Sequence, residues 1–212
     1  SADSTARDLT LSAGSGTIAV SNAIGGIQEL DVITITQSGG VTFSGAINAD
    51  TVTLTDTTGS VTFAGSTVLE TLNTADQDYN VIFNGSTNTF ADAVTFSNTG
   101  YITFGNASDD SSTFDNGLTT AAPSEIRLAG TLQTSNDAMT VGTAVVLYAN
   151  SILNTGSAAL TVGSTVDGGY TLDLNSTAAT TFSGIVGSST ALTAITTNSG
   201  GTVVFNTTAI TT

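Results

Sequence analysis

The sequence predicts an all-β fold, a parallel β-helix (β-solenoid) with rungs of about 20–21 residues. Three observations lead to this prediction. A short apolar motif recurs at a nearly fixed interval. Apolar and small polar residues alternate within its copies and between them, as half-buried strands require. Helical spacing of apolar residues never persists beyond one turn, because Gly or Asn interrupts nearly every ten residues.

The first series of copies starts at residues 41–45 (VTFSG) and recurs at 61–65 (VTFAG) and 81–85 (VIFNG), each 20 residues after the last. A fourth copy at 101–105 (YITFG) keeps its glycine in phase, while its Phe slips by one place. Residues one period apart stack directly in a solenoid. We therefore expect an aromatic stack in the core made of Phe43, Phe63, Phe83 and Phe104.

A second series lies at residues 138–142 (AMTVG), 159–163 (ALTVG) and 180–184 (TTFSG), with a spacing of 21. The glycine that closes each copy is expected at a corner of the rung, where the backbone needs a positive φ or passes close to the next rung. These corner glycines are Gly45, Gly65, Gly85, Gly105, Gly142, Gly163 and Gly184.

An antiparallel meander also fits short strands, but it gives no reason for a fixed period. It also needs tight-turn dipeptides between the strands, and these are scarce. Stacked rungs explain both observations. At a strand spacing of about 4.8 Å, the chain is expected to form about ten rungs and a rod roughly 50 Å long.

The repeat loses its phase between Gly105 and Gly142. Residues 106–124 are therefore predicted to form an irregular rung or loop that protrudes from the single solenoid segment 1–212, and Pro123 cannot donate to a central ladder. The loop carries oxygen ligands of the kind that Ca²⁺ prefers. The candidate Ca²⁺ ligands are Asn106, Asp109, Asp110 and Asp115. The alternative is a solvated acidic loop, and no other cofactor is expected.

The composition excludes several classes of function. Two basic and 17 acidic residues give a net charge of −15, which repels nucleic acid and anionic membrane surfaces. The sequence contains no run of about 18 apolar residues, so no membrane-embedded segment is predicted. The chain has no His or Cys, and its two basic residues are Arg7 and Arg127. Thiol and histidine catalysis are therefore excluded, and Ser or Thr nucleophiles lack their usual bases.

We accordingly predict that the chain is not an enzyme. The alternative is a carbohydrate-active β-helix that uses carboxylate pairs, with Asp76/Asp78 or Asp109/Asp110/Asp115 as candidates. Outward Thr rows, as at residues 34/36 and 51/53/55, suggest a further alternative, an ice-binding lattice. Thr is also favoured on any half-buried strand. The Thr-x-Thr motif is not repeated at the 20-residue period, which argues against ice binding.

Several phrases resemble the repeats of long bacterial surface proteins, the filamentous-haemagglutinin-like and beta-strand-repeat adhesins. They are residues 40–48 (GVTFSGAIN), residues 181–195 (TFSGIVGSSTALTAI) and the linking phrase 9–16 (LTLSAGSG). The resemblance covers most of the chain except residues 106–124. It implies a right-handed parallel β-helix that is extracellular, at the cell surface, and acts as a stalk, fibre or adhesive rod.

From these observations we expect a structural or adhesive segment of a longer repetitive protein. Neither end reads as a polar cap, so self-association end to end, or packing against adjacent repeats, is the expected partnership. The alternative is an adhesin module that binds a host or cell-surface glycan or protein through the loop at residues 106–124.

Overall fold

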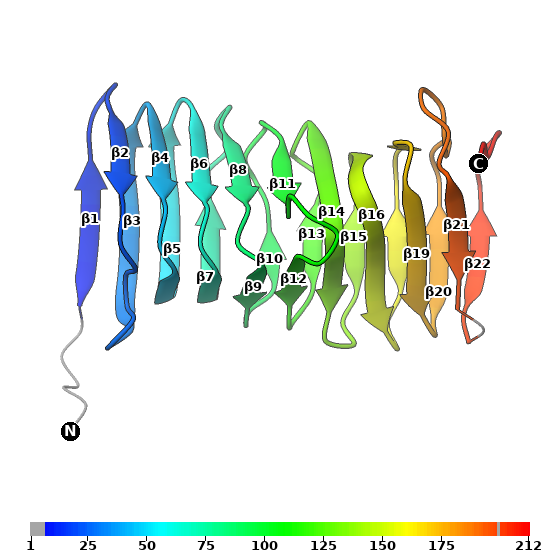
Figure 1. Cartoon of the computed structure of the whole chain (residues 1–212), viewed down its shortest axis with the longest axis horizontal. Helices are drawn as coiled ribbons and strands as arrows, with labels where there is room; N and C mark the ends of the chain where they lie inside the picture. The colour runs from blue at the N-terminus through cyan, green and yellow to red at the C-terminus, as the bar shows by residue number, and fades with distance from the viewer. Residues whose placement is uncertain (1–6, 199) are drawn as a thin grey trace.

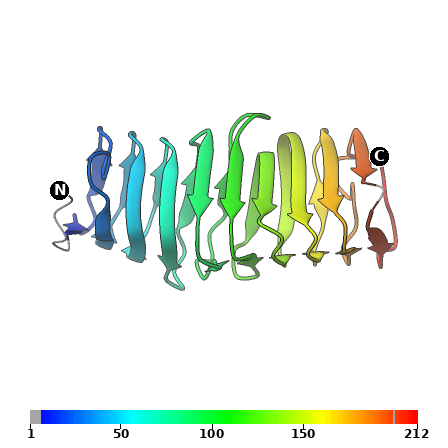
Figure 2. The ribbon, with the colours of Figure 1, turned by 90° about the horizontal axis from the view of Figure 1, so that it is seen from below.

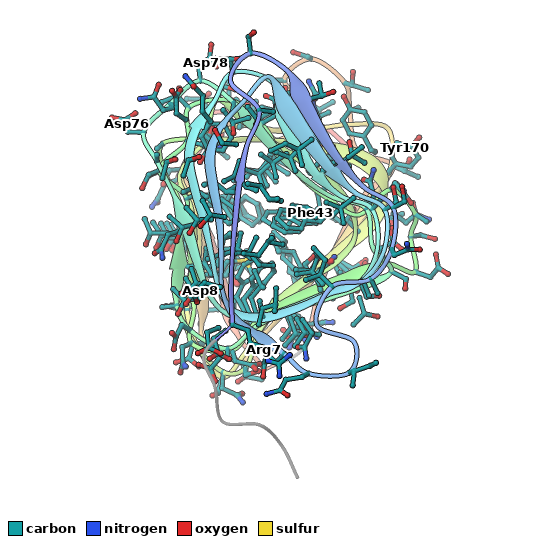
Figure 3. The ribbon with its side chains drawn as sticks, turned by 90° about the vertical axis from the view of Figure 1, so that its left-hand side faces the viewer. Arg7, Asp8, Phe43, Asp76, Asp78 and Tyr170 are labelled. Carbon is teal, nitrogen blue, oxygen red and sulfur yellow. The ribbon has the colours of Figure 1, made fainter. Side chains whose placement is uncertain are left out.

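The computed structural model describes residues 7–198 and 200–212. These residues form strands β1 to β22 and no helix. The strands are parallel and stack into a β-solenoid of about nine turns, which runs as one rod from the N-terminal to the C-terminal end (Figure 1). Viewed from the N-terminal end, the chain coils clockwise as it recedes, so the solenoid is right-handed (Figure 3). The predicted fold class is therefore confirmed, while residues 1–6 and 199 lie outside the described part of the chain.

Each rung contributes to three faces. Face 1 consists of β2 (Thr17–Val20), β4 (Gly40–Phe43), β6 (Ser60–Phe63), β8 (Asn80–Phe83), β11 (Ile102–Phe104), β18 (Val166–Asp167) and the first parts of β14 (Glu125–Thr134) and β16 (Ala144–Gly156). Face 2 consists of the first parts of β5 (Ile47–Thr57) and β7 (Thr67–Thr74), then β9 (Thr87–Phe90), β12 (Ser111–Phe114), the second parts of β14 and β16, β19 (Thr171–Ser176) and β21 (Ala194–Thr197).

Face 3 begins with β1 (Asp8–Ser12), β3 (Leu30–Ser38) and the second parts of β5 and β7. It continues as a separate six-stranded sheet, which consists of β10 (Val94–Thr95), β13 (Leu118–Thr120), β15 (Met139–Val141), β17 (Leu160–Val162), β20 (Ala179–Phe182) and β22 (Thr202–Phe205). Strands of successive rungs lie side by side along the whole rod (Figure 2).

The alternation in the sequence places apolar residues inside and hydroxyl residues outside. On face 1, Val41 pairs with Val61 and Val61 with Val81. The same strands carry buried Phe residues two places later. The rings of Phe43 and Phe63 are stacked with centroids 5.4 Å apart, and those of Phe63 and Phe83 are 4.9 Å apart. Phe90, Phe96 and Phe114 pack edge-on against the end of this stack.

The fourth copy differs from the expectation. Phe104 pairs directly with Phe83, so the Phe keeps its place and the glycine shifts. The amide of Gly105 donates to the carbonyl of Phe83, as the amide of Asn84 donates to that of Phe63. Gly105 therefore occupies the position of Asn84 and not that of Gly85. A buried aromatic position determines the alignment, because the core tolerates a one-residue change in a turn better than a change in its packing.

The two repeat series lie on different faces. Residues 41–43, 61–63, 81–83 and 102–104 belong to face 1, whereas residues 139–141, 160–162 and 180–182 belong to face 3. The loss of phase between Gly105 and Gly142 therefore reflects a change of face rather than an interruption of the coil.

The prediction of an irregular protruding loop at residues 106–124 is wrong. This segment contains β12 and β13, which both pair in parallel with the neighbouring rungs. Pro123 is buried in the turn between β13 and β14, where no ladder hydrogen bond is required of it. Rung lengths vary because the turns differ in length, while the strands remain aligned.

The predicted corner glycines are of two kinds. Gly45, Gly65 and Gly85 follow one another along the rod, and a Cβ at Gly65 or Gly85 would overlap the backbone of the preceding glycine. Close approach therefore requires glycine there. A Cβ at Gly163 would lie 3.4 Å from the Cα of Gly142, which is ordinary contact. Gly163 is a corner residue that the geometry does not require.

Candidate functional surfaces

Three of the four predicted Ca²⁺ ligands, Asn106, Asp109 and Asp110, lie on the turn between β11 and β12. Asp110 is 6% exposed, and its Oδ2 accepts hydrogen bonds from the amides of Asn106, at 2.7 Å, and Ala107, at 3.0 Å. Its carboxylate therefore closes the turn that follows Gly105, whose φ is 75°. Asp110 supports the local fold, and its Oδ2 is already engaged by two backbone donors.

The other predicted ligands lie apart from this carboxylate. Asp109 is exposed on the turn, and Asp115 follows β12, where it accepts a hydrogen bond from the hydroxyl of Ser135 in the next rung. Among the described residues, no three His, Cys, Asp or Glu side chains gather in a group that can hold a metal ion. The structure thus does not assemble Asp109, Asp110 and Asp115 into the expected site.

The second carboxylate pair, Asp76 and Asp78, lies on the turn from face 3 to face 1. Both side chains point outward from the rod and are exposed (Figure 3). Tyr79 closes this turn from inside: it is buried, and its hydroxyl accepts a hydrogen bond from the amide of Ala75 at 3.0 Å. Burial, the largest cause, raises the pKa of Tyr79 to about 12, so the phenol stays neutral at physiological pH.

A cluster of aromatic side chains surrounds Arg127 on face 1. The Arg127 guanidinium carbon lies 3.6 Å from the ring centroid of Tyr101 and 5.9 Å from that of Tyr148. Its Nε donates to the carboxylate of Glu125 at 2.7 Å, as the proximity of the two residues in the sequence indicates. This hydrogen bond is the main cause of the raised pKa of Arg127. Tyr148 itself is 54% exposed.

The Tyr101–Arg127–Tyr148 cluster was not predicted from the sequence. Tyr101 precedes Ile102, which pairs with Ile126, so Tyr101 and Arg127 come from adjacent rungs. Tyr148 follows Leu147, the partner of Leu128 in the next rung. The sequence places these three residues near equivalent positions of successive rungs. The rungs differ in length, so the repeat period alone does not align the three residues.

The two ends of the rod are a further candidate surface. Within the described residues, β1 pairs only with β3 and β2 only with β4, while β22 pairs only with β20 and β21 only with β19. Each end therefore has free strand edges. Ile210, the last residue of the core column on face 1, is 45% exposed, whereas Val61 and Val81 of the same column are 0% exposed.

An open recess also lies at the N-terminal end. It is lined by residues that include Arg7, Asn22, Gly25, Ile27 and Leu30. Ile27 is fully exposed and lines this recess together with Arg7, which lies at the edge of the cross-section (Figure 3). The recess belongs to the end surface, and among the described residues its lining contains no carboxylate.

Comparisons with known proteins assign no family to the chain. No family model matches it, and neither a curated protein nor a solved structure matches it. No helix long and apolar enough to cross a membrane occurs among the described residues.

Proposed function

We propose that this chain is a segment of a stiff rod or fibre at the cell surface, with a structural or adhesive role and no chemistry of its own. One observation carries the proposal. On face 1, a single column of paired apolar residues runs without interruption from one end of the rod to the other. It consists of Ile18, Val41, Val61, Val81, Ile102, Ile126, Val145, Val166, Val186 and Ile210.

Continuous columns make the rod stiff, because bending it would open ladder hydrogen bonds and core contacts in every rung. The outer surface is acidic and rich in hydroxyl groups, and this favours the solubility of the rod. The adhesin-like phrases of the sequence support the extracellular setting. The segment expected to carry recognition, residues 106–124, is part of the regular coil and gives no support to a binding tip.

The two ends are complementary in direction. Strands on every face are parallel, so a second rod can continue the ladders only head to tail. In that arrangement Ile18 of one copy lies beside Ile210 of the next, in the order that Val166 and Val186 already follow inside the rod. Further rungs of a longer chain would satisfy the same edges.

Sedimentation velocity and electron microscopy over a concentration series test this proposal. We expect end-to-end oligomers or filaments of one rod width. Ile210→Lys places a charge on the end and should abolish them. Val68→Lys is the matched control, because Val68 is also exposed, at 47%, but lies on the side of the rod. A chain that stays monomeric at every concentration, or equal loss in both variants, would contradict end-to-end assembly.

A specific observation favours a second candidate, glycan binding by the Tyr101–Arg127–Tyr148 cluster. The Tyr148 ring, which is 54% exposed, offers a flat apolar face for stacking, and the nearby guanidinium and carboxylate provide donors and acceptors for sugar hydroxyls. A glycan array with the wild-type chain and Tyr148→Ala tests this candidate. Binding that is lost in the variant supports it, and an array without specific binding rejects it.

A further inference from the structure

A row of Thr side chains runs along the outside of the six-stranded sheet of face 3. Thr95 pairs with Thr119, Thr119 with Thr140, Thr140 with Thr161 and Thr161 with Thr181. We call these five residues the Thr row. Their neighbours along each strand point into the core, as the buried Leu160 and Val162 on either side of Thr161 show. The five side chains therefore face solvent at the strand spacing of about 4.8 Å.

The hydroxyl groups of the Thr row are unoccupied. All five residues lie in strands that the structure describes. Among the described residues, none of their five side-chain hydroxyls makes a hydrogen bond to another protein group. The corresponding set on the N-terminal half of face 3 is shorter and mixed. Thr10 pairs with Thr34 and Thr34 with Thr53, but Asn73 follows, and its side-chain amide donates to the Thr53 hydroxyl. Thr55 on the same face donates to backbone carbonyls. Within the described residues, the C-terminal half of the face thus presents the longer row of hydroxyls that make no hydrogen bond to the protein.

The surroundings of the row are mostly small and uncharged, and the charged residue beside it is Asp76, which shares a shallow recess with Thr95 at one end of the row. Thr140 is flanked by Ala138 and Gly142, and Thr161 by Ala159 and Gly163. The six strands β10, β13, β15, β17, β20 and β22 contain no charged residue, although the chain has a net charge of −15. Their pairings run without a bulge, whereas β14 and β16 on the neighbouring faces carry register shifts.

From this arrangement we infer that the Thr row is an ice-binding surface. Each Thr offers a hydroxyl that holds a water molecule and a methyl group that borders it. Repetition at the strand spacing places the held waters at intervals close to those at which equivalent water molecules repeat in ice. Charged side chains would impose a different water order, and their absence from this sheet preserves the lattice. Adsorbed rods then block the advance of the crystal between them.

A second copy of the chain is a poorer occupant of this face. Pairing two Thr rows would remove five hydroxyls per copy from water and bury only small methyl groups in return, so the contact would gain little apolar burial. Ice, in contrast, supplies a hydrogen-bond partner for every hydroxyl. The inference concerns the side of the rod and is independent of its end-to-end assembly.

Face 1 supplies a control surface. Thr62 also points outward and makes no hydrogen bond to another protein group within the described residues, but its column continues from Thr42 through Thr62 to Ile82. Arg127 and Asp167 stand at the same outward position further along. A bulky substitution at Thr62 therefore matches one at Thr140 or Thr161 in exposure and chemistry, without touching a regular row.

The test uses ice itself as the probe. The difference between melting and freezing temperatures is measured by nanolitre osmometry, and the enrichment of the protein in slowly growing ice is measured separately. We expect the wild-type chain to separate the two temperatures and to enter the ice. Thr140→Lys and Thr161→Lys should each reduce both effects at least tenfold, while Thr62→Lys retains them. Circular dichroism melts confirm that all three variants remain folded.

Two results would overturn the inference. One is a wild-type chain that shows no temperature difference and no more enrichment in ice than an unrelated β-protein. The other is an equal loss in Thr62→Lys and Thr161→Lys, because this would exclude a special role of the Thr row. Thr161→Ser and Thr161→Val separate the contributions of the methyl and the hydroxyl group, and both should weaken ice binding without altering the fold.

Discussion

The ring of Phe104 lies almost parallel to that of Phe83, with centroids 5.9 Å apart and an interplanar angle of 4°. One residue more separates this pair than separates Phe63 from Phe83. The turns of that rung absorb the additional residue, and the aromatic stack continues. Side-chain packing in the core therefore determines which residues of successive rungs face one another.

Removing Phe83 tests the importance of this stack. Phe83 is fully buried and contacts the rings of Phe63, Phe90 and Phe104. We expect Phe83→Ala to lower the free energy of unfolding by about 3–5 kcal/mol, because it leaves a cavity between rungs that cannot close. Denaturant unfolding measures the change. Thr62→Ala, on the outside of the neighbouring strand, is the control, and a similar loss in both variants would contradict a core role of the stack.

The glycine corners make a second prediction. Gly65→Ala is expected to lower the free energy of unfolding by more than about 1 kcal/mol, since its Cβ would overlap the Gly45 backbone. Gly163→Ala meets only ordinary contacts and has no positive φ, so it should be neutral or stabilise the fold by up to about 1 kcal/mol. Thermal melts of the two variants distinguish the positions. Equal destabilisation would show that both corners require glycine.

Calcium is expected to have no specific effect on stability. The predicted carboxylates do not gather, and Asp110 closes a turn instead. Millimolar CaCl₂ should therefore raise the melting temperature no more than NaCl of equal ionic strength. Asp110→Ala should cost about 1 kcal/mol in either salt, because two amides lose their acceptor. A larger shift with CaCl₂ that disappears in Asp110→Ala would restore the metal site.

Asp167 gives a prediction for pH. Partial burial opposes its ionisation, but hydrogen bonds from the Ser189 and Thr190 amides and the Ser188 hydroxyl outweigh this and lower its pKa. A folded-state pKa below the unfolded value stabilises the fold above the unfolded pKa, about 3.9, and this stabilisation is lost as pH falls through the folded value.

Asp167→Ala should therefore be less stable than wild type at pH 7, by less than about 1 kcal/mol because solvent screens this partly exposed carboxylate. The difference is expected to remain constant down to about pH 5 and to shrink below about pH 4. Denaturant unfolding across this range measures it. Asp173→Ala is the control, because the Asp173 carboxylate makes no hydrogen bond within the described residues. A difference that persists unchanged at about pH 3 would show that ionised Asp167 is not the cause.

The sequence by itself determined the class of the fold. Alternation of Val, Phe and Thr specifies strands with one buried face, and the recurrence of the VTF motif near every 20 residues specifies parallel stacking. These signals are local or strictly periodic, so they survive without knowledge of the turns. The lack of His and Cys likewise excluded histidine and thiol chemistry, because no fold can supply a side chain that the chain does not contain.

Only the tertiary structure decided which residues share a face. The motif at residues 139–141 resembles the one at 41–43, yet the first belongs to face 3 and the second to face 1, since both kinds of strand need the same alternation. Three members of the Thr row, Thr140, Thr161 and Thr181, lie in the second repeat series, but the continuation of the row to Thr119 and Thr95 and the Tyr101–Arg127–Tyr148 cluster stayed hidden for the same reason. Each rung closes through turns of different length, so positions adjacent in space have no fixed separation in the chain, and core packing alone brings them into line.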